Sequence, residues 1–390
     1  MSSRVRRATT TLLSLLMLLP LAGCGWLDIF SKEDGNEPMR LERINAQVEI
    51  DRLWRVSVGN GQGKKYNVLR PALSGNRVFA AGNNGEVVAV QADNGRVVWR
   101  KRTKQVITGG VGASNGLVVV GTENSRVLAF AEDDGRELWS AEVSSEVLAP
   151  PATNGRIVVV QTVDGRLTGL DAATGQQRWI YENDVPALSL RGTSAPLILE
   201  NFVIAAMANG SVVSIATDNG TLRWEQRVAI PTGRSDIERL VDIDGPVWLN
   251  EAGQILVTAY QGYLAVIDAV TGQTRWRTEA SSWVGNASGF GNAYLADESG
   301  NVRAFRIGQD QPVWTNESLL RRRLSTPVGF SNYLAVGDFE GYVHFLSQID
   351  GRIVGRTKVD GDGLRAPMIA QGNTLYAYGN GGSLVALRVR

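Results

Sequence analysis

A repeating unit of about 40 residues runs through this sequence and limits the folds that it can adopt. Each unit opens on glycine or serine, continues with alternating apolar residues and, in most copies, reaches a tryptophan 14 residues later. Openings at positions 85, 125, 165, 210, 262, 300, 341 and 382 are separated by 38 to 52 residues. Regular periods in this range are typical of propellers and solenoids, in which each repeat is one supersecondary unit.

Each unit has the pattern of a four-stranded antiparallel blade. Apolar residues on both faces, such as Val87 and Val88, indicate a strand that is buried on both sides. Turn pairs such as Asn94-Gly95 predict a tight hairpin before the strand that carries Trp99. A loop and a further apolar strand follow, as at residues 156–160. The sequence therefore predicts an all-β, eight-bladed β-propeller of four-stranded antiparallel blades.

The two ends of the repeat array complement each other. The eighth unit begins at Gly382 and stops at Arg390 without its final strand, whereas residues 53–58 form a final strand with nothing before it. Pairing these two pieces would close the ring and leave no open sheet edge. We therefore expect a propeller over residues 50–390, closed by the N-terminal strand in the C-terminal blade.

The N-terminus has the features of a secretory signal peptide. Arg4, Arg6 and Arg7 precede an apolar run from Leu12 to Ala22, which at 11 residues is shorter than the roughly 20 needed to cross a bilayer. We expect residues 1–23 to be removed. Removal takes three of the 40 basic residues and none of the 39 acidic ones, changing the net charge from +1 to about −2. This charge provides no basic surface for nucleic acid.

Residues 21–24 resemble the bacterial lipobox, which implies lipidation of Cys24, the only cysteine. A lone cysteine in a secreted chain can also be a free thiol or form an intermolecular disulfide. Its position after an apolar run and two small residues favours the lipid, and Gly25 in this resemblance implies export to the outer membrane. We expect residues 24–49 to form a lipidated N-terminus and a flexible, polar tether.

The repeated tryptophans could suggest an aromatic ligand cage. A large ring at the same place in every blade is instead expected to wedge between blades and to donate its N–H to neighbouring backbone. Gly355 replaces the tryptophan of the seventh unit, so we expect different packing there.

The sequence indicates no enzyme and no cofactor or metal site. His344 is the only histidine and lies in a strand, where a partly buried structural role is expected. Without a second histidine or a spare cysteine, typical zinc sites and histidine-based triads are excluded. Asp133-Asp134 falls in a hairpin turn, where aspartate bonds local backbone. Calcium ligation by scattered oxygen ligands stays open.

Two inter-blade segments are unusually long. From the tryptophan to the next unit is usually 24 to 27 residues, but it is 31 after Trp179 and 38 after Trp224. We expect these consecutive loops, at 184–195 and 231–246, to lie side by side on one face, where repeat proteins usually bind partners. Alternatively, the leucines of the first loop simply cover a blade junction.

Two other segments carry conspicuous patterns. Residues 59–65 are glycine-rich but lack the strand-to-helix context of a phosphate loop, and we interpret them as a mobile surface loop. Arg321–Arg323 could bind lipid or a partner, although three adjacent like charges are more often a solvated face.

The unit from Asp164-Gly165 to Trp179 resembles the repeat of pyrroloquinoline-quinone (PQQ) enzymes, which is structural and does not imply the cofactor. Together with the lipobox and the eight units, it resembles the BamB family, lipoprotein subunits of the β-barrel assembly machinery, from Cys24 to Arg390. The resemblance implies a non-catalytic scaffold that docks onto the periplasmic POTRA domains of the central barrel subunit, BamA. The positions that match the family's partner-binding residues are Leu188, Leu190, Arg191, Asp242 and Asp244.

Two rival functions remain at this point. A PQQ-dependent quinoprotein dehydrogenase has a similar propeller, but this chain is short for that family and lacks the adjacent cysteines that many members use. A periplasmic lipoprotein could also capture extended peptides, such as unfolded outer-membrane protein clients, at a strand edge.

Overall fold

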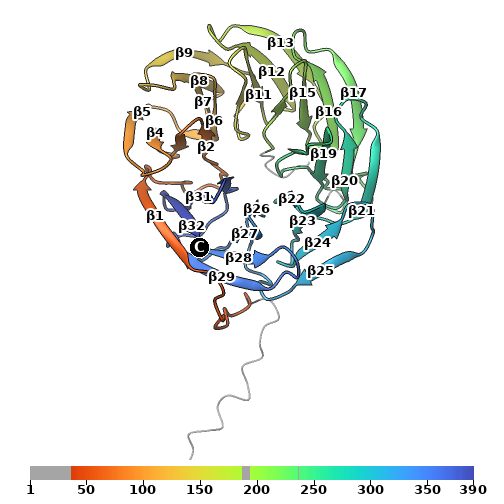
Figure 1. Ribbon diagram of the computed structural model, residues 1–390. Coiled ribbons are helices and arrows are strands. Elements are labelled where there is room, and N and C mark those ends of the chain that lie inside the picture. Colours follow the sequence, from red (N-terminus) through yellow and green to blue (C-terminus); the bar gives the residue numbers. More distant parts are fainter. Residues whose placement is uncertain (1–36, 187–193, 236) are drawn as a thin grey trace, which may run out of the picture. The chain divides into compact units, whose positions relative to one another are not determined.

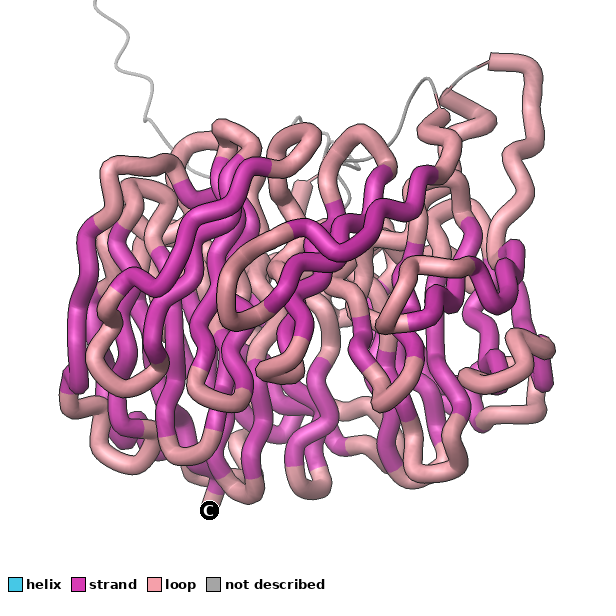
Figure 2. Tube along the Cα trace, turned by 90° about the horizontal axis from the view of Figure 1, so that it is seen from above, coloured by secondary structure: helices cyan, strands magenta, loops and turns pink. Residues whose placement is uncertain are grey.

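Eight four-stranded antiparallel sheets form the molecule, as the repeat predicted. The computed structural model describes residues 37–186, 194–235 and 237–390, and no helix occurs in these ranges. The sheets stand as blades around a central axis (Figure 1). Their strands run between two opposite faces, and loops project farther on one face than on the other (Figure 2). This confirms the predicted all-β, eight-bladed β-propeller.

The strands follow the chain in order. Blade 1 consists of β2 (Ala72–Ser74), β3 (Arg77–Ala81), β4 (Glu86–Gln91) and β5 (Val97–Arg102), and blade 2 of β6 (Ile107–Ser114), β7 (Leu117–Thr122), β8 (Arg126–Ala131) and β9 (Glu137–Glu142). Blade 3 consists of β10 (Ala152–Thr153), β11 (Ile157–Gln161), β12 (Arg166–Asp171) and β13 (Gln177–Glu182), and blade 4 of β14 (Leu197–Ile198), β15 (Phe202–Ala206), β16 (Ser211–Ala216) and β17 (Leu222–Arg227). Blade 5 consists of β18 (Trp248–Leu249), β19 (Gln254–Thr258), β20 (Tyr263–Asp268) and β21 (Thr274–Glu279), and blade 6 of β22 (Asn286–Gly289), β23 (Asn292–Ala296), β24 (Val302–Arg306) and β25 (Pro312–Asn316). Blade 7 consists of β26 (Val328–Phe330), β27 (Tyr333–Gly337), β28 (Tyr342–Ser347) and β29 (Ile353–Lys358).

Blade 8 contains both ends of the propeller. It consists of β30 (Ile369–Gln371), β31 (Thr374–Tyr378), β32 (Ser383–Val389) and β1 (Ile50–Ser57), with β1 as the outer strand. The two end strands pair antiparallel from Ile50 opposite Val389 to Ser57 opposite Ser383. In Figure 1, β1 lies beside β32 and closes the ring. The predicted ring closure is therefore confirmed.

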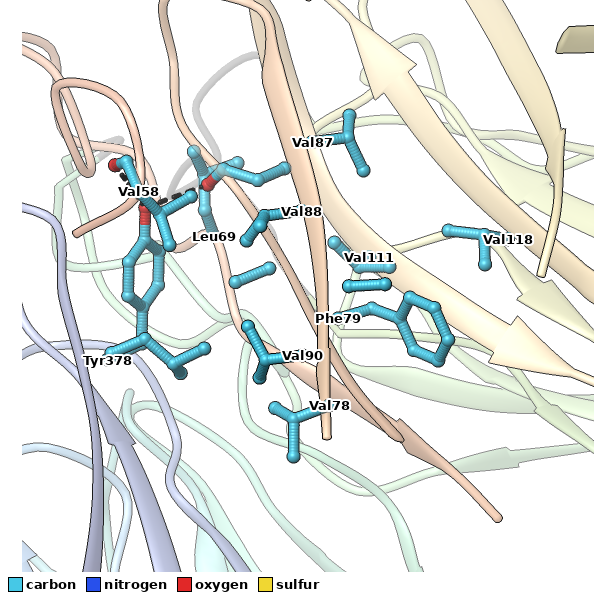
Figure 3. Packing of buried hydrophobic residues seen from close by; sticks show 14 of the residues in the cluster. Val58, Leu69, Val78, Phe79, Val87, Val88, Val90, Val111, Val118 and Tyr378 are labelled. Atoms are coloured by element: carbon cyan, nitrogen blue, oxygen red, sulfur yellow. Dashed lines mark hydrogen bonds between the residues drawn. The ribbon is translucent and has the colours of Figure 1, made fainter. Parts of the chain in front are cut away.

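The middle strands of each blade supply the core. In β4, every residue from Glu86 to Val90 is buried, because its two faces contact the neighbouring blades on either side. Figure 3 shows Phe79 and Val90 of blade 1 in one cluster with Val118 of blade 2 and Tyr378 of blade 8. The Tyr378 hydroxyl donates to the backbone oxygens of Val58 and Ala81 at 3.3 and 3.0 Å, so this buried polar group is satisfied.

Tryptophans of the outer strands join successive blades, as predicted. In six of the seven repeat positions the indole N–H donates to a backbone oxygen of the next blade at 2.8 to 3.3 Å: Trp54 to Ala92, Trp99 to Glu132, Trp139 to Ala172, Trp179 to Thr217, Trp224 to Ala269 and Trp314 to Gln348. The ring also covers the hairpin glycine of that blade. A Cβ on Gly135, for example, would lie 2.7 Å from the Trp99 ring. The glycines of these turns are therefore needed for contact as well as for backbone conformation.

Trp276, at the junction of blades 5 and 6, departs from this pattern. Its Nε1 has no hydrogen-bond partner among the described residues. The hairpin glycine of the next blade, Gly308, also has nothing within 4 Å of a built Cβ. The Trp276 indole thus has neither the N–H bond nor the glycine contact that the other repeat tryptophans show.

The N-terminal segment fills the place of the tryptophan that the seventh unit lacks. A Cβ on Gly355 would lie 2.7 Å from Val48 and 3.0 Å from Ile50. The Gln47 N–H donates to the Val354 oxygen at 2.8 Å. The expectation of different packing at this junction is confirmed. Residues 38–48 lie in the same compact unit as the propeller, which spans Pro38–Arg390.

A buried ionic network in blade 7 corrects the interpretation of Arg321–Arg323 as a solvated face for Arg322, whereas Arg321 and Arg323 are exposed as expected. Arg322 is 3% exposed, and its Nε donates to Asp338 at 2.9 Å while Nη1 donates to the Met39 oxygen at 2.9 Å. His344, fully buried, contacts the same Asp338 carboxylate at 2.9 Å and accepts from Arg356 Nε at 3.0 Å. His344 is therefore structural, as predicted, and is buried more completely than expected.

The glycine-rich segment 59–65 is also anchored rather than being a mobile surface loop. Gln62 is fully buried, donating to the Leu69 oxygen at 3.0 Å and accepting its N–H at 2.6 Å. A Cβ on Gly61 would lie 2.1 Å from the Asn380 oxygen, so only glycine fits against blade 8 there. The sequence interpretation was wrong because a single buried glutamine organises the loop.

The contribution of the tryptophan–glycine contact to stability can be measured by substituting alanine for two glycines that have nearly equal φ. Gly135 and Gly291 have φ of +70° and +73°, but a built Cβ on Gly291 has nothing within 4 Å. Alanine at either position carries the same left-handed strain, whereas only Gly135→Ala collides with Trp99. Gly135→Ala should lower the free energy of unfolding by about 1–3 kcal/mol more than Gly291→Ala in urea titrations. Equal losses would show that the indole contact contributes nothing.

The blade 7 network should make stability depend on pH. Burial lowers the pKa of His344, against the opposing effect of its hydrogen bond to Asp338. The unfolded state, with a pKa near 6.5, therefore takes up a proton before the folded state does. Stability is complete above about pH 6.5 and should fall as the pH drops toward 5.

The matched variant is His344→Gln, which keeps a donor and an acceptor but does not titrate. Urea midpoints from pH 7.5 to 5 should decline less steeply in the variant than in the wild type. Parallel profiles would exclude His344 as the source of the slope.

Candidate partner-docking face

Two long inter-blade loops meet on one face of the propeller. The first, residues 183–196, joins β13 to β14, and the second, residues 228–247, joins β17 to β18. A fourth strand ends on the same face where the next first strand begins, so both loops lie on that face. A cavity of about 180 Å³ is lined by Val185 and Ser194 of the first loop and by Asp242 and Ile243 of the second. The predicted side-by-side arrangement is therefore confirmed for the described parts of these loops.

The structure describes only part of the predicted contact set. Leu188, Leu190 and Arg191 lie outside the described residues, as does Cys24. Asp242 and Asp244 are both described, and they occupy different surroundings. Their roles in partner binding stay predictions.

Asp242 faces the interior and fixes the second loop. The residue is 1% exposed, and one carboxylate oxygen accepts the N–H of Ile243 at 2.8 Å. Its backbone oxygen accepts the N–H of Tyr260 at 2.8 Å, which forms an isolated bridge to blade 5. Burial favours a role in holding the loop in one shape over direct contact with a basic group of a partner.

Asp244 lies two residues further on, at the mouth of the central channel. It lines a small recess with Tyr66, Trp283 and Arg365. The Tyr66 and Trp283 rings stack with centroids 6.2 Å apart, and the Arg365 guanidinium lies 5.0 Å from the Tyr66 centroid. Burial raises the pKa of the Tyr66 phenol, Arg365 opposes this effect and Asp244 reinforces it. The Asp244 carboxylate is thus part of a polar cluster at the channel entrance.

Several residues of this face were missed by the sequence analysis. Val163 and Val185 are 42% and 39% exposed beside the cavity, and Ile230 and Ile237 in the second loop are 59% and 75% exposed. Val163 occupies a hairpin turn in which most other blades carry polar residues, a signal that was available in the aligned repeats. Exposed apolar side chains around a hollow are typical of a protein interface.

Acidic groups surround the same hollow. Glu146, Asp184 and Asp242 contribute to its lining together with Leu148 and Met207. The described residues contain no group of three or more histidine, cysteine, aspartate or glutamate side chains that could hold a metal ion. An apolar hollow with an acidic margin can accept an apolar side chain next to a basic one.

Comparison with known proteins identifies the family. The family model described as "Outer membrane protein assembly factor BamB" matches residues 50–107, 83–316 and 298–390. A relative of that name from Pseudomonas aeruginosa is 54% identical over 375 residues, covering 96% of this chain and 98% of the relative. The chain belongs to the BamB family. A BamB from Escherichia coli is 36% identical over 385 residues, covering 96% of this chain and 97% of the relative.

Solved structures agree with this assignment. The crystal structure of BamB from Moraxella catarrhalis has a TM-score of 0.80 and 29% identity, covering 87% of this chain and all of that one. A quinohemoprotein alcohol dehydrogenase from Comamonas testosteroni has a TM-score of 0.69 at 14% identity, covering 87% of this chain and 76% of that one. The second likeness shows a shared fold alone. In the part of this BamB-family chain that the structure describes, no helix is long and apolar enough to cross a membrane.

The contrast between Asp242 and Asp244 gives a direct test of which carboxylate shapes the loop. Asp242→Ala leaves the buried Ile243 N–H without its acceptor, which should lower the free energy of unfolding by about 1–3 kcal/mol. Asp244→Ala, at a half-buried position at the channel mouth, should lower it less. Urea titration of both variants measures the difference. If the two losses are equal, Asp242 has no special role in holding the loop.

Proposed function

We propose that this protein is the BamB-type subunit of the β-barrel assembly machinery in the outer membrane, acting as a non-catalytic scaffold. The observation that carries the proposal is the match to proteins named outer membrane protein assembly factor BamB over almost the whole chain. A non-catalytic role is supported by His344, the single histidine of the sequence, because both of its ring nitrogens are hydrogen-bonded, one to Asp338 and one to Arg356.

Docking would use the face with the two long loops. Leu188 and Leu190 would enter apolar pockets of the POTRA domains of the central barrel subunit, and Arg191 would pair with backbone or acidic groups there. Asp242, held inside, would fix the orientation of the second loop, while Asp244 would meet a basic group. The exposed Val163 and Val185 beside the cavity extend the apolar part of this surface. Unfolded outer-membrane protein clients could contact the same machinery through the scaffold.

The N-terminus would place the propeller at the membrane. Residues 1–23 would be removed as a signal peptide, and acyl chains on Cys24 would hold the protein on the periplasmic face of the outer membrane. Because residues 38–48 belong to the propeller unit, the expected tether shortens to the residues between Cys24 and Pro38. That length would keep the docking face within reach of a membrane-bound partner.

Charge reversal at Arg191 tests the docking surface. Tagged full-length protein is purified from detergent-solubilised membranes, and bound proteins are identified by mass spectrometry. The wild type should retain a barrel protein with POTRA domains, and Arg191→Glu should lose it, because reversing a buried interface charge typically costs several kcal/mol. The control is Arg136→Glu, which changes an exposed arginine in a hairpin of blade 2 without touching the loops.

Circular dichroism establishes that each variant is folded. If the wild type retains no such barrel protein, the assembly role is wrong. If Arg191→Glu retains as much of it as Arg136→Glu does, the assembly role stands but this docking surface is wrong.

A further inference from the structure

The central channel contains a charged group without a counter-ion. Arg70 lies just before β2, at the level where the channel mouth meets the wider cavity, and it lines both. No described residue forms an ion pair or a side-chain hydrogen bond with its guanidinium. Burial lowers the pKa of Arg70 to about 10, so the side chain is still protonated at neutral pH. Arg70 is only partly exposed to solvent. A cation in such surroundings without a bonded partner attracts an anion.

The backbone around Arg70 is held firmly, which fixes where the side chain leaves the main chain. Both backbone polar groups of Leu69 are bonded to the buried Gln62 side chain. The Arg70 oxygen accepts the Val111 N–H of β6 at 3.3 Å, and a Cβ on Gly110 would lie 2.8 Å from the Arg70 nitrogen. Only a glycine at 110 allows this approach. The position of Arg70 is therefore built into the contact between blades 1 and 2.

Apart from Arg70, Thr153 and Ser288, the side chains that line the wider cavity are apolar. Its volume is about 550 Å³, within the range of small-molecule sites, and its walls are the first strands of the blades at the centre of Figure 1. Pro71, Leu73, Trp248 and Met368 are among the lining residues, and Arg70 is the one charged residue in that lining. The Trp248 N–H donates to the Asn286 oxygen at 2.5 Å, so its indole N–H is already bonded.

The mouth beyond Arg70 is narrow. The stacked Tyr66 and Trp283 rings, with Arg365 over Tyr66, leave a recess of only about 50 Å³. Arg365 itself is engaged, because its Nε donates to Asn380 at 3.1 Å. A ligand held by Arg70 would therefore extend away from the mouth, along the apolar walls.

We propose that the central channel binds a small amphipathic anion, with Arg70 holding the anionic head and the inner strands enclosing an alkyl chain. A single guanidinium matches one carboxylate or one phosphate, and it donates to either in a forked geometry. The apolar walls match a hydrocarbon chain. This site adjoins the proposed docking surface, because Arg70 and Asp244 line the same recess. It uses different side chains for binding, and its failure would leave the assembly role untouched.

The test uses full-length, processed protein in a neutral maltoside detergent, with octanoate as the probe and octanol as its uncharged counterpart. Isothermal titration calorimetry should show one octanoate per chain, and octanol should bind much more weakly. Affinity should rise about four-fold for each methylene from hexanoate to octanoate, since burial of a CH₂ contributes about 0.8 kcal/mol. Octyl phosphate in a parallel titration distinguishes a fatty-acid-type head from a phospholipid-type head.

Arg70→Met removes the charge and keeps an apolar side chain of similar length, so octanoate should bind at least about ten-fold more weakly. Arg70→Lys should restore part of the affinity, and Arg365→Met, which changes the engaged guanidinium, should leave it unchanged. Ala370→Phe, which narrows the cavity with Arg70 intact, should also abolish binding. Thermal unfolding monitors the fold of each variant.

Equal binding of octanoate to the wild type and Arg70→Met would overturn the proposal, since micelles take up the probe equally in both samples. Absence of binding by both octanoate and octyl phosphate would overturn it as well. If Arg70→Met fails to fold, Arg70→Lys and Ala370→Phe decide the question.

Discussion

The contact between an indole and a hairpin glycine of the next blade is the interaction on which the ring depends. A single blade buries its middle strands only when neighbours cover both faces, so the seams between blades hold the protein together. At each regular seam one tryptophan places its ring on a glycine and its N–H on a carbonyl, as Trp139 does with Gly175 and Ala172. The apolar ring and the polar N–H are satisfied together, which leaves no buried donor unpaired.

The seam between blades 7 and 8 solves the same problem with different parts. Gly355 provides no ring, and Val48 and Ile50 fill the space. Further along the same segment, backbone oxygens of Met39 and Glu42 accept bonds from Arg322 and Arg356 at 2.9 and 3.1 Å. The Asp338 carboxylate joins these groups through Arg322 and His344. The N-terminus thus supports the propeller at the seam where the repeat lacks its tryptophan, besides pairing with the last strand.

Most of the fold could be predicted from the sequence because the same pattern of strands and turns recurs in each unit. Eight copies of one spacing determine the blades, and the incomplete first and last units determine the closure. Single residues with distant partners could not be predicted this way. Arg322 appears solvated beside two other arginines, and its burial depends on Asp338 and on a carbonyl 283 positions away. Gln62, in a glycine-rich stretch, gave no sign that it would bind Leu69 from within the core.

At the candidate docking face too, the repeat pattern predicts where the loops lie but not the surroundings of single residues. The lengths of two loops predicted that they lie side by side, and the cavity that both line confirms this for their described parts. Chain length does not reveal that Asp242 is turned inward or that Pro246, four residues later, lines the central channel. The second loop is therefore fixed at its C-terminal base by a buried carboxylate and by the channel wall. A rigid base of this kind lowers the entropy lost when a loop binds a partner, which favours a scaffold whose function is docking.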